Sequence, residues 1–257
     1  MTEFIPTPER QKQILSLLTR QGRLSVGEIV EQFSISEATA RRDLETLASQ
    51  GKVQRVHGGV IAIEEAPPEL PILDRENEQP DEKKRIGRAA AELVNDNETV
   101  FLGSGTTVLE VARNLRDRKN LTVITNSLPV LNTLVGLKEI TVIALGGMLR
   151  DSELSFIGHI TEQSIAELRA DKVIIGARAI SLEHGLTNDY LPETQTDRAI
   201  LKVGREVILV ADHSKINRVS TTFLAPLTDI NTLVTDKQTP RAFISALKTE
   251  GINLIVV

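Results

Sequence analysis

The second half of the chain alternates short apolar runs with amphipathic segments, and this alternation constrains the fold more than any other feature. From residue 99 onward the runs are rich in valine, isoleucine and leucine, as in TVFLG, LTVIT, ITVIALGG, DKVIIGA, EVILVAD and INLIVV. Segments typical of helices, such as TVLEVARNL and PRAFISALKTEG, lie between them. Short buried strands joined by helices are typical of βαβ crossovers, because parallel neighbours need a long connection. The sequence therefore predicts an α/β domain with a mostly parallel sheet covered on both faces.

A proline-rich, acidic segment precedes this pattern. EEAPPELPILDRENEQP, residues 64–80, holds four prolines and six acidic residues. Proline removes backbone donors and acidic side chains resist burial, so this composition is typical of a linker. We expect residues 1–63 and residues 81–257 to form separate domains, joined by residues 64–80.

The first domain shows three helical patterns followed by a hairpin pattern. Helices are predicted over residues 9–22, 26–33 and 36–51, the last with Ser36 as its N-cap. The segment KVQRVHGGVIAI then alternates apolar and polar residues around Gly58-Gly59, which predicts a β-hairpin. Three helices and a wing of this length predict a winged helix-turn-helix, whose third helix enters the major groove of DNA.

The third predicted helix has an apolar face and a polar face. At about 100° per residue, Ala40, Leu44 and Leu47 share the face that packs on the core. The polar face and the hairpin supply the candidate DNA-binding residues, which are Ser36, Ala38, Thr39, Arg41, Arg42, Arg55 and His57. Arginine is suited to guanine and to phosphate oxygens.

The alternative is a solvated amphipathic helix with no nucleic acid partner. Residues 1–60 hold 8 basic and 7 acidic side chains, a net charge of +1. That charge is too small to decide between a DNA-binding helix and a solvated one.

The composition excludes several kinds of site. The chain has no cysteine, which excludes disulfides, thiolate zinc sites and a cysteine nucleophile. Its four histidines show no metal-ligand spacing, so we expect neither a metal nor a cofactor. The start MTEFIPTPERQKQ lacks the basic and apolar regions of a signal peptide, and no stretch approaches membrane-spanning length. We therefore expect a cytoplasmic protein.

Polar stretches follow several apolar runs of the predicted sheet. Ligands of open α/β sheets bind at the carboxyl ends of the strands, where these stretches would meet. Together they supply N–H groups, hydroxyls, an amide and cations, which suit a phosphorylated, hydroxyl-rich small molecule. The candidate effector-binding residues are Gly103, Ser104, Gly105, Thr106, Thr107, Thr125, Asn126, Ser127, Gly146, Gly147, Arg150, Arg178, Glu193 and Lys215.

Each polar stretch also has a purely structural interpretation. Residues 103–107 would form a tight strand-to-helix turn, and Asn126 or Ser127 would cap the helix that follows. Gly146-Gly147 would be a bend, and Lys215 a solvated surface residue. Residue types alone do not decide between these interpretations.

The stretch SISEATARRDLETLASQGKVQRVHGGV resembles the DNA-binding domain of the DeoR family of bacterial transcriptional regulators. The matching residues are Ser36, Thr39, Ala40, Arg41, Arg42, Asp43, Leu44, Leu47, Gly51, Arg55, His57, Gly58 and Gly59, with alanine at 40 where the family usually has isoleucine. The resemblance continues over nearly the whole chain. It implies a repressor of a carbohydrate operon that binds double-stranded operator DNA and responds to a phosphorylated sugar effector. We expect a homo-oligomer, a dimer or a tetramer, because one winged helix-turn-helix reads only one half-site.

The resemblance further implies that the second domain is similar in fold to ribose-5-phosphate isomerase. A bifunctional isomerase with a DNA-binding domain is therefore the alternative function, and it needs a carboxylate that moves a proton. Such isomerases have a Gly-Ala-Asp-Glu segment where this chain has Gly176-Ala177-Arg178-Ala179, and arginine is no base at neutral pH. We therefore expect a sensor without catalytic activity.

Two positions depart from the sensor domains that the chain resembles. The family typically has aspartate where this chain has Gly103 and Arg178, which predicts an altered choice of effector. Glu193 is either a polar contributor to the pocket or a carboxylate at the start of a helix.

Overall fold

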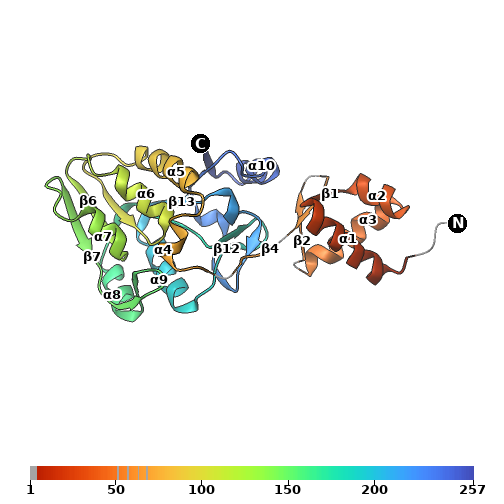
Figure 1. Cartoon of the computed structure of the whole chain (residues 1–257), viewed down its shortest axis with the longest axis horizontal. Coiled ribbons are helices and arrows are strands. Elements are labelled where there is room, and N and C mark those ends of the chain that lie inside the picture. Colours follow the sequence, from red (N-terminus) through yellow and green to blue (C-terminus); the bar gives the residue numbers. More distant parts are fainter. Residues whose placement is uncertain (1–4, 51, 57, 63, 68) are drawn as a thin grey trace.

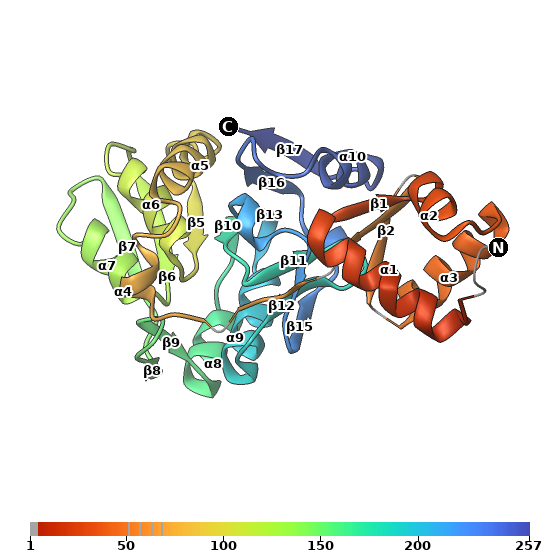
Figure 2. The same ribbon diagram turned by 45° about the vertical axis from the view of Figure 1, so that its right-hand side comes forward.

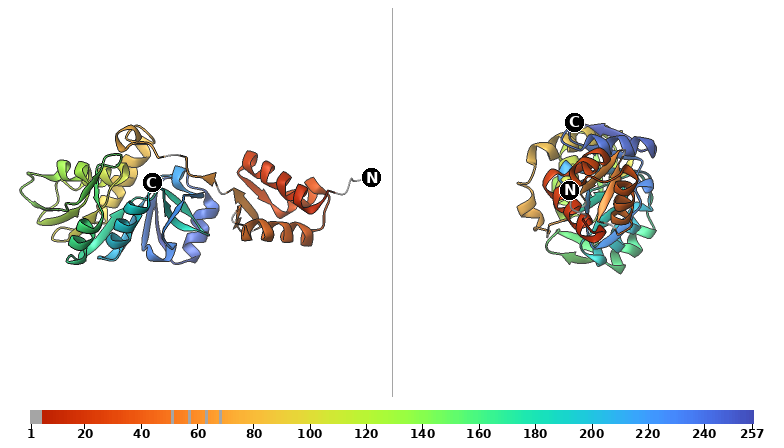
Figure 3. Two further views of the ribbon diagram at one scale, coloured as in Figure 1. Left: turned by 90° about the horizontal axis from the view of Figure 1, so that it is seen from below. Right: turned by 90° about the vertical axis from the view of Figure 1, so that its right-hand side faces the viewer.

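The computed structural model describes residues 5–50, 52–56, 58–62, 64–67 and 69–257. Gly51, His57 and Pro68, which the sequence analysis uses, lie outside these residues. The chain forms a smaller N-terminal unit and a larger C-terminal unit, shown in red to orange and in yellow to blue in Figure 1. Figure 3 shows the N-terminal unit at one end of the C-terminal unit.

Three helices and a small antiparallel sheet make up the N-terminal unit. Its elements are α1 (Thr7–Gln21), β1 (Arg23–Ser25), α2 (Val26–Phe33), α3 (Glu37–Ser49), β2 (Val53–Val56) and β3 (Gly59–Ala62). The strand order β1-β3-β2 confirms the predicted hairpin and adds β1, which the sequence did not predict. A Cβ atom on Gly59 would lie 2.2 Å from the carbonyl oxygen of Leu24, so the close approach of β1 and β3 requires glycine there.

Local signals explain where these helices begin and end. α1 ends at Gly22, which adopts the left-handed conformation with φ 71°. α2 begins with a capping box, in which the Ser25 hydroxyl accepts from the Glu28 N–H and the Glu28 carboxylate accepts from the Ser25 N–H. The predicted N-cap of α3 is confirmed, because Ser36 Oγ accepts from the Thr39 N–H at 3.2 Å.

One buried ion pair joins the first helix to the third. Arg10 Nε donates to Asp43 Oδ2 at 2.6 Å, and Gln11 Nε2 donates to the other carboxylate oxygen at 3.1 Å. The Arg10 and Asp43 side chains are 7% and 3% exposed. The predicted apolar face of α3 is buried in the core beside them. Because either charge alone would be costly to bury, the pair fixes the position of α1 on α3.

The C-terminal unit is an α/β domain around a seven-stranded sheet in which all neighbouring strands are parallel. In spatial order the strands are β17 (Asn253–Val256), β16 (Thr232–Thr235), β13 (Gly204–Val210), β10 (Ala170–Ile175), β5 (Thr99–Leu102), β6 (Leu121–Thr125) and β7 (Ile140–Ala144). The main helices are α5 (Pro80–Glu92), α6 (Thr106–Asn114), α7 (Leu128–Leu134), α8 (His159–Ala166), α9 (Leu191–Leu201) and α10 (Arg241–Thr249). This architecture confirms the predicted fold class.

Alternate residues of the central strands enter two different cores. Val100 and Leu102 of β5 pack in a cluster with α5, α6 and α7, whereas Phe101 packs in a cluster with α8, α9 and α10. Helices therefore cover both faces of the sheet, as predicted. None of the helices in the described ranges combines the length and apolar character that a bilayer crossing requires.

Shorter antiparallel elements lie beside the main sheet. β11 (Ala179–Ser181), β12 (Gly185–Asn188) and β15 (Thr222–Ala225) form one small sheet, and β8 (Met148–Arg150) and β9 (Ser155–Ile157) form a hairpin. The sequence patterns did not predict these elements, because each strand is only three or four residues long.

The proline-rich segment is held against the C-terminal unit. β4 (Glu64–Glu65) pairs in parallel with β14 (Arg218–Val219), and the Ile72 N–H donates to the Ser152 carbonyl at 2.7 Å. A single helical turn, α4 (Ile72–Arg75), follows with its first and last residues buried. Figure 2 shows the segment crossing the C-terminal unit from the N-terminal unit to α4. Its linker composition therefore does not prevent it from packing.

Candidate functional site

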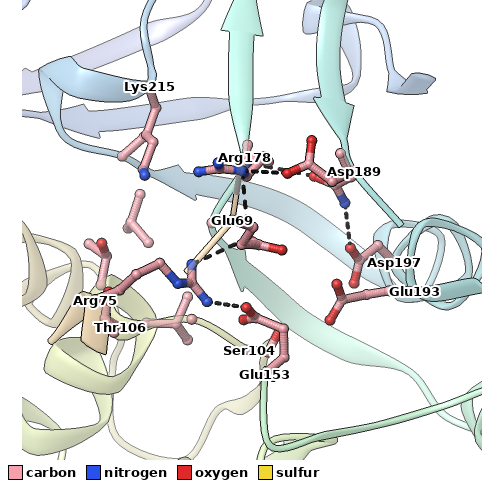
Figure 4. A pocket seen from close by; sticks show the side chains of 18 of the residues that line it. Glu69, Arg75, Ser104, Thr106, Glu153, Arg178, Asp189, Glu193, Asp197 and Lys215 are labelled. Carbon is pink, nitrogen blue, oxygen red and sulfur yellow. Dashed lines mark hydrogen bonds and ion pairs between the residues drawn. The ribbon is translucent and has the colours of Figure 1, made fainter. Parts of the chain in front are cut away.

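A polar cavity lies where the carboxyl ends of β5, β10 and β13 meet β12, α9 and the proline-rich segment. Its lining side chains include two lysines, two arginines and five carboxylates, many of which point toward the centre in Figure 4. The candidate effector-binding residues that line it are Ser104, Gly105, Thr106, Thr107, Arg178, Glu193 and Lys215. The fold thus brings together residues that the sequence placed on separate strands and helices.

One wall of the cavity is the N-terminus of α6. Gly105 is the N-cap, with φ 109°, and no side chain caps the helix. The first turn holds no acidic residue, and its two threonines, Thr106 and Thr107, line the cavity. An uncapped helix N-terminus presents N–H groups and a partial positive charge, so this wall suits an anion.

Two lysines add positive charge to the same region. Lys83 of α5 is buried, and its Nζ donates to the Arg75 carbonyl at 2.6 Å. Lys215 lines the cavity, and within the described residues its Nζ forms neither a hydrogen bond nor a close ion pair, although the Asp212 charge attracts it. Burial lowers the pKa of both amines, and the nearby Asp212 carboxylate opposes that shift. An anion bound beside Lys215 would favour its charged form in the same way.

The opposite wall carries carboxylates and an amide. Asn188 Nδ2 donates to Asp197 Oδ2 at 2.8 Å, and burial raises the pKa of Asp197 to about 7. Glu193 accepts a hydrogen bond from Ser155 Oγ at 3.1 Å. Carboxylates accept hydrogen bonds and amides both donate and accept them, so this wall suits a ligand with hydroxyl groups.

Three arginines lie in and beside the cavity, and each pairs with an acidic side chain. The pairs are Arg75 with Glu153, Arg150 with Glu193, and Arg178 with Asp189. The three arginine side chains are 14% exposed or less. Burial raises the pKa of Glu153, and the Arg75 guanidinium opposes that shift. The guanidinium charges are therefore compensated by the protein itself.

A fourth acidic side chain, Glu69 of the proline-rich segment, contacts all three arginines. Its carboxylate oxygens lie 3.4 Å from Arg75 Nη1, 3.1 Å from Arg150 Nη2 and 3.8 Å from Arg178 Nε. Figure 4 shows Glu69 between Arg178 and Arg75. Arg150, a candidate that is not among the lining residues, thus reaches the site through Glu69 and Glu193.

Three other candidates hold the end of β6 in place. Thr125 Oγ1 donates to a backbone carbonyl of β5 at 2.7 Å, and Asn126 Nδ2 donates to one of β9 at 3.0 Å. Ser127 caps α7 through its hydroxyl. All three are buried and lie outside the set of residues that line the cavity, so effector contact with them stays a prediction.

The remaining candidates are Gly103, Gly146 and Gly147, of which Gly103 and Gly147 lie at close approaches. A Cβ on Gly147 would lie 2.0 Å from Thr161 Oγ1, which donates to the Gly146 carbonyl at 2.8 Å. A Cβ on Gly103 would lie 3.2 Å from Ile175 Cγ2, a tight contact. These glycines are likewise not among the lining residues, so their contact with an effector is also untested.

The candidate DNA-binding residues lie on the open face of α3 and on the wing. Ala38, Arg41, Arg42 and Arg55 are exposed, while Thr39 is half-buried with its hydroxyl 2.8 Å from that of Ser36. Arg41 and Arg55 form ion pairs with exposed glutamates of α3. His57 lies outside the described residues. Exposed pairs of this kind are weak, so these arginines are available to another partner.

Two family descriptions match the chain. Residues 10–66 match the DeoR-like helix-turn-helix domain, and residues 78–237 match the DeoR C terminal sensor domain. The chain belongs to the DeoR family of transcriptional regulators. It is therefore a DNA-binding regulator with an N-terminal helix-turn-helix domain and a C-terminal sensor domain.

Curated relatives of this DeoR-family regulator are similar over most of its length. The transcriptional repressor AccR of Agrobacterium fabrum is 36% identical over 237 residues, which are 92% of each chain. The glycerol-3-phosphate regulon repressor of Escherichia coli is 36% identical over 246 residues, covering 96% of this chain and 97% of that protein. Ribose-5-phosphate isomerase A of Methanocaldococcus jannaschii aligns over 53% of this chain and 54% of that chain, with 19% identity and a TM-score of 0.40.

Several charged residues of this cavity in the sensor domain of the DeoR-family regulator were not predicted from the sequence. They are Glu69, Arg75, Lys83, Glu153 and Asp189. One of them, Lys83, could have been predicted from the sequence, because it lies on the buried face of α5 with Ile86 and Ala90. A lysine in such a stripe is seldom buried without a function or a partner.

Proposed function

We propose that this DeoR-family regulator represses a carbohydrate operon and that a phosphorylated sugar in the sensor cavity changes its affinity for operator DNA. The observation that carries this proposal is the polarity of the cavity. One wall offers a helix N-terminus and Lys215 to an anion, and the other offers carboxylates and an amide to hydroxyl groups. A sugar phosphate carries an anionic phosphate at one end and hydroxyl groups at the other, so it matches both walls.

The polarity also suggests how the ligand is oriented. Its phosphate would accept hydrogen bonds from the first N–H groups of α6, from the hydroxyls of Thr106 and Thr107, and from Lys215. Its hydroxyls would bond to Asp197 and Asn188 on the opposite wall. Both parts of the ligand would then be held by side chains that come from rigid elements.

We propose that residues 1–63 bind DNA, that residues 81–257 bind the effector, and that residues 64–80 connect them. A single helix-turn-helix reads one half-site, so operator binding with high affinity requires at least two copies of the chain. Arg42, exposed on α3, is the side chain best placed for a base edge or a phosphate.

We propose that the cavity senses its ligand without transforming it. Arg178 stands where isomerases of the resembling fold have an acid, and it pairs with Asp189 at 2.8 Å. Asp197 is the cavity carboxyl best suited to move a proton, because its pKa is about 7. Isomerisation of an aldose or ketose phosphate that disappears in Asp197→Asn would favour the enzyme alternative.

A panel of aldose and ketose phosphates, each paired with its unphosphorylated sugar, tests the proposal. At 100 times its Kd, a ligand stabilises the folded protein by about 2.7 kcal/mol, which raises the melting temperature by several degrees. At least one phosphate should do so and should release the protein from promoter DNA, while its unphosphorylated partner does neither. If no member of the panel stabilises the protein, the cavity does not bind sugar phosphates.

A further inference from the structure

Glu69 lies in the sensor cavity although it belongs to the proline-rich segment. Its side chain is 13% exposed, and its carboxylate is within 3.8 Å of a nitrogen of each of Arg75, Arg150 and Arg178. Carboxylates and phosphates bind guanidinium groups in the same way, through charged hydrogen bonds to oxygen. Glu69 therefore occupies a place that suits an anion, in the same cavity as the N-terminus of α6 and Lys215, to which the proposed function assigns the phosphate.

The space that remains around Glu69 is small. The cavity has a volume of about 70 Å³, whereas sites for small organic ligands have roughly 300–1,000 Å³. A sugar phosphate needs more room than this arrangement leaves. Some lining group must withdraw before such a ligand binds.

Among the described residues between β4, which pairs with β14, and α4, few bonds attach the segment that carries Glu69. The Ala66 N–H donates to the Val219 carbonyl at 2.9 Å, and Arg178 donates from Nη2 to the Pro67 carbonyl. Beyond Glu69, the next backbone bond to the domain is that of Ile72. Of the other lining carboxylates, Glu193 and Asp197 lie on α9, Asp189 lies between β12 and α9, and Glu153 lies in the turn of the β8–β9 hairpin. Glu69 belongs to the proline-rich segment, so it can withdraw without moving α9 or that hairpin.

We propose that Glu69 is an internal competitor for the effector cavity, which the anionic group of the ligand displaces, and that its displacement releases the segment from Glu64 to Ile72 from the sensor domain, while Arg75 stays in the cavity. This inference rests on the proposed function. A phosphate that replaces Glu69 leaves Arg75 and Arg178 paired. A neutral sugar would leave Arg75 and Arg178 with one carboxylate each, Glu153 and Asp189, in place of two. Glu69 therefore makes the cavity select for anionic ligands.

The same displacement reaches the DNA-binding domain. Strand β3 of the wing ends at Ala62, and β4 begins two residues later at Glu64. Arg178 holds the segment twice, through the Pro67 carbonyl and through Glu69. A ligand that binds Arg178 would break its contacts with the Pro67 carbonyl and with Glu69, and would thereby loosen the connection to the wing. Arg178, at which this chain departs from the family pattern, thereby couples the cavity to the linker.

Calorimetric titration of the full chain with inorganic phosphate at low ionic strength tests the competition. The Glu69→Gln variant should bind phosphate about tenfold more tightly than the wild type, as expected if the open arrangement is populated at roughly 10% in the wild type. Asp74→Asn removes an exposed carboxylate of the same segment and should leave the affinity unchanged. The amide oxygen of Glu69→Gln could still accept hydrogen bonds from the arginines, so Glu69→Ala, which lacks that oxygen, repeats the measurement. Equal affinity in the wild type and both Glu69 variants overturns the inference.

Hydrogen exchange of the full chain tests the release of the segment. Saturating phosphate should reduce the protection of the Ala66 and Ile72 amides in the wild type, and Glu69→Gln should show reduced protection without phosphate. Protection that persists in the phosphate-bound protein overturns the release of the segment.

The Lys215→Ala variant separates this inference from the proposed function. Phosphate binding that is equal in the wild type and Glu69→Gln, and lost in Lys215→Ala, would leave the proposed function standing and overturn the competition. If neither phosphate nor any sugar phosphate binds to the wild type or to Glu69→Gln, both proposals fail.

Discussion

The arginines compared in the two domains differ in their exposure to solvent and in the ion pairs they form. In the helix-turn-helix domain, Arg41 is 51% exposed and its partner glutamate is 64% exposed. In the sensor domain, Arg75, Arg150 and Arg178 are 14% exposed or less, and each is paired within the domain. An exposed pair contributes little and exchanges readily, whereas a buried pair is costly to break. In the proposed function, DNA phosphates would meet accessible cations, while a small ligand would have to compete with partners already in place.

The buried pair of Arg10 and Asp43 is the exception within the helix-turn-helix domain, and it offers the largest test of this comparison. Asp43→Ala leaves Arg10 buried without its partner, so the domain should lose about 3–5 kcal/mol of stability. Glu37→Ala removes an exposed partner from the same helix and should cost about 0.5 kcal/mol or less. Urea unfolding of the full chain, followed by circular dichroism, measures both. Similar losses in the two variants would contradict the distinction between buried and exposed pairs.

Lys215 tests whether the cavity needs a cation that forms no hydrogen bond or close ion pair with the described residues. Lys215→Ala removes one charged hydrogen bond to the ligand, worth about 1.5–3 kcal/mol, or roughly 10- to 100-fold in affinity. Thermal shift with the sugar phosphate found in the panel measures the loss, and gel shift without ligand should remain as in the wild type. Lys237→Ala, an exposed lysine outside the cavity, is the matched control. A normal response in Lys215→Ala would remove this residue from the site.

Arg42 tests whether the open face of α3 contacts DNA. Arg42→Ala should weaken operator binding by about 1–3 kcal/mol, because it removes a base or phosphate contact. Gel shift at several salt concentrations, with Arg88→Ala of α5 as the control, distinguishes these two kinds of contact. If Arg42 contacts a phosphate, its loss should lower the slope of log affinity against log salt concentration by about one. If it contacts a base, its loss should change the sequence preference. Unchanged affinity would show that α3 is not the recognition helix.

Asp197 gives the smallest expected effect, and it depends on pH. A carboxyl with a raised pKa in the folded state binds a proton that the unfolded chain has already lost, so it destabilises the fold as pH rises through about 7. Between pH 6 and pH 8 the wild type should lose about 1.4 kcal/mol relative to Asp197→Asn, or roughly 3–6 °C in melting temperature. Asp117→Asn, at an exposed position, should show no such difference. A pH-independent difference would place the pKa of Asp197 outside this range.

Much of the fold was predictable because its signals are local. The cap at Ser36 and the stop at Gly22 depend on residues within one helical turn, so the sequence alone placed the ends of α1 and α3 to within about two residues. β1 was missed because its three residues carry no period, and only pairing with β3, far along the chain, makes them a strand.

The cavity was predictable only in part, because some of its residues come from local motifs and others meet only through contacts that are distant in the sequence. The turn into α6 is local, and its position beside Lys215 follows from parallel strands ending at one edge of the sheet. Glu69 meets Arg150 across 81 positions, and Arg178 meets Pro67 across 111 positions. No periodicity or spacing reports such contacts. Predicting these contacts requires knowing the path of the proline-rich segment. Its composition alone suggested a linker that does not pack on the domain.

The short parallel pairing of β4 with β14 gives the proline-rich segment a register. A residue inserted between this pairing and Glu69 would lengthen the segment by up to about 3.3 Å. One inserted residue would therefore carry the carboxylate of Glu69 away from the arginines. We therefore expect the number of residues between the wing and Glu69 to matter for function, so that a stretch whose composition is typical of a linker should not tolerate insertions.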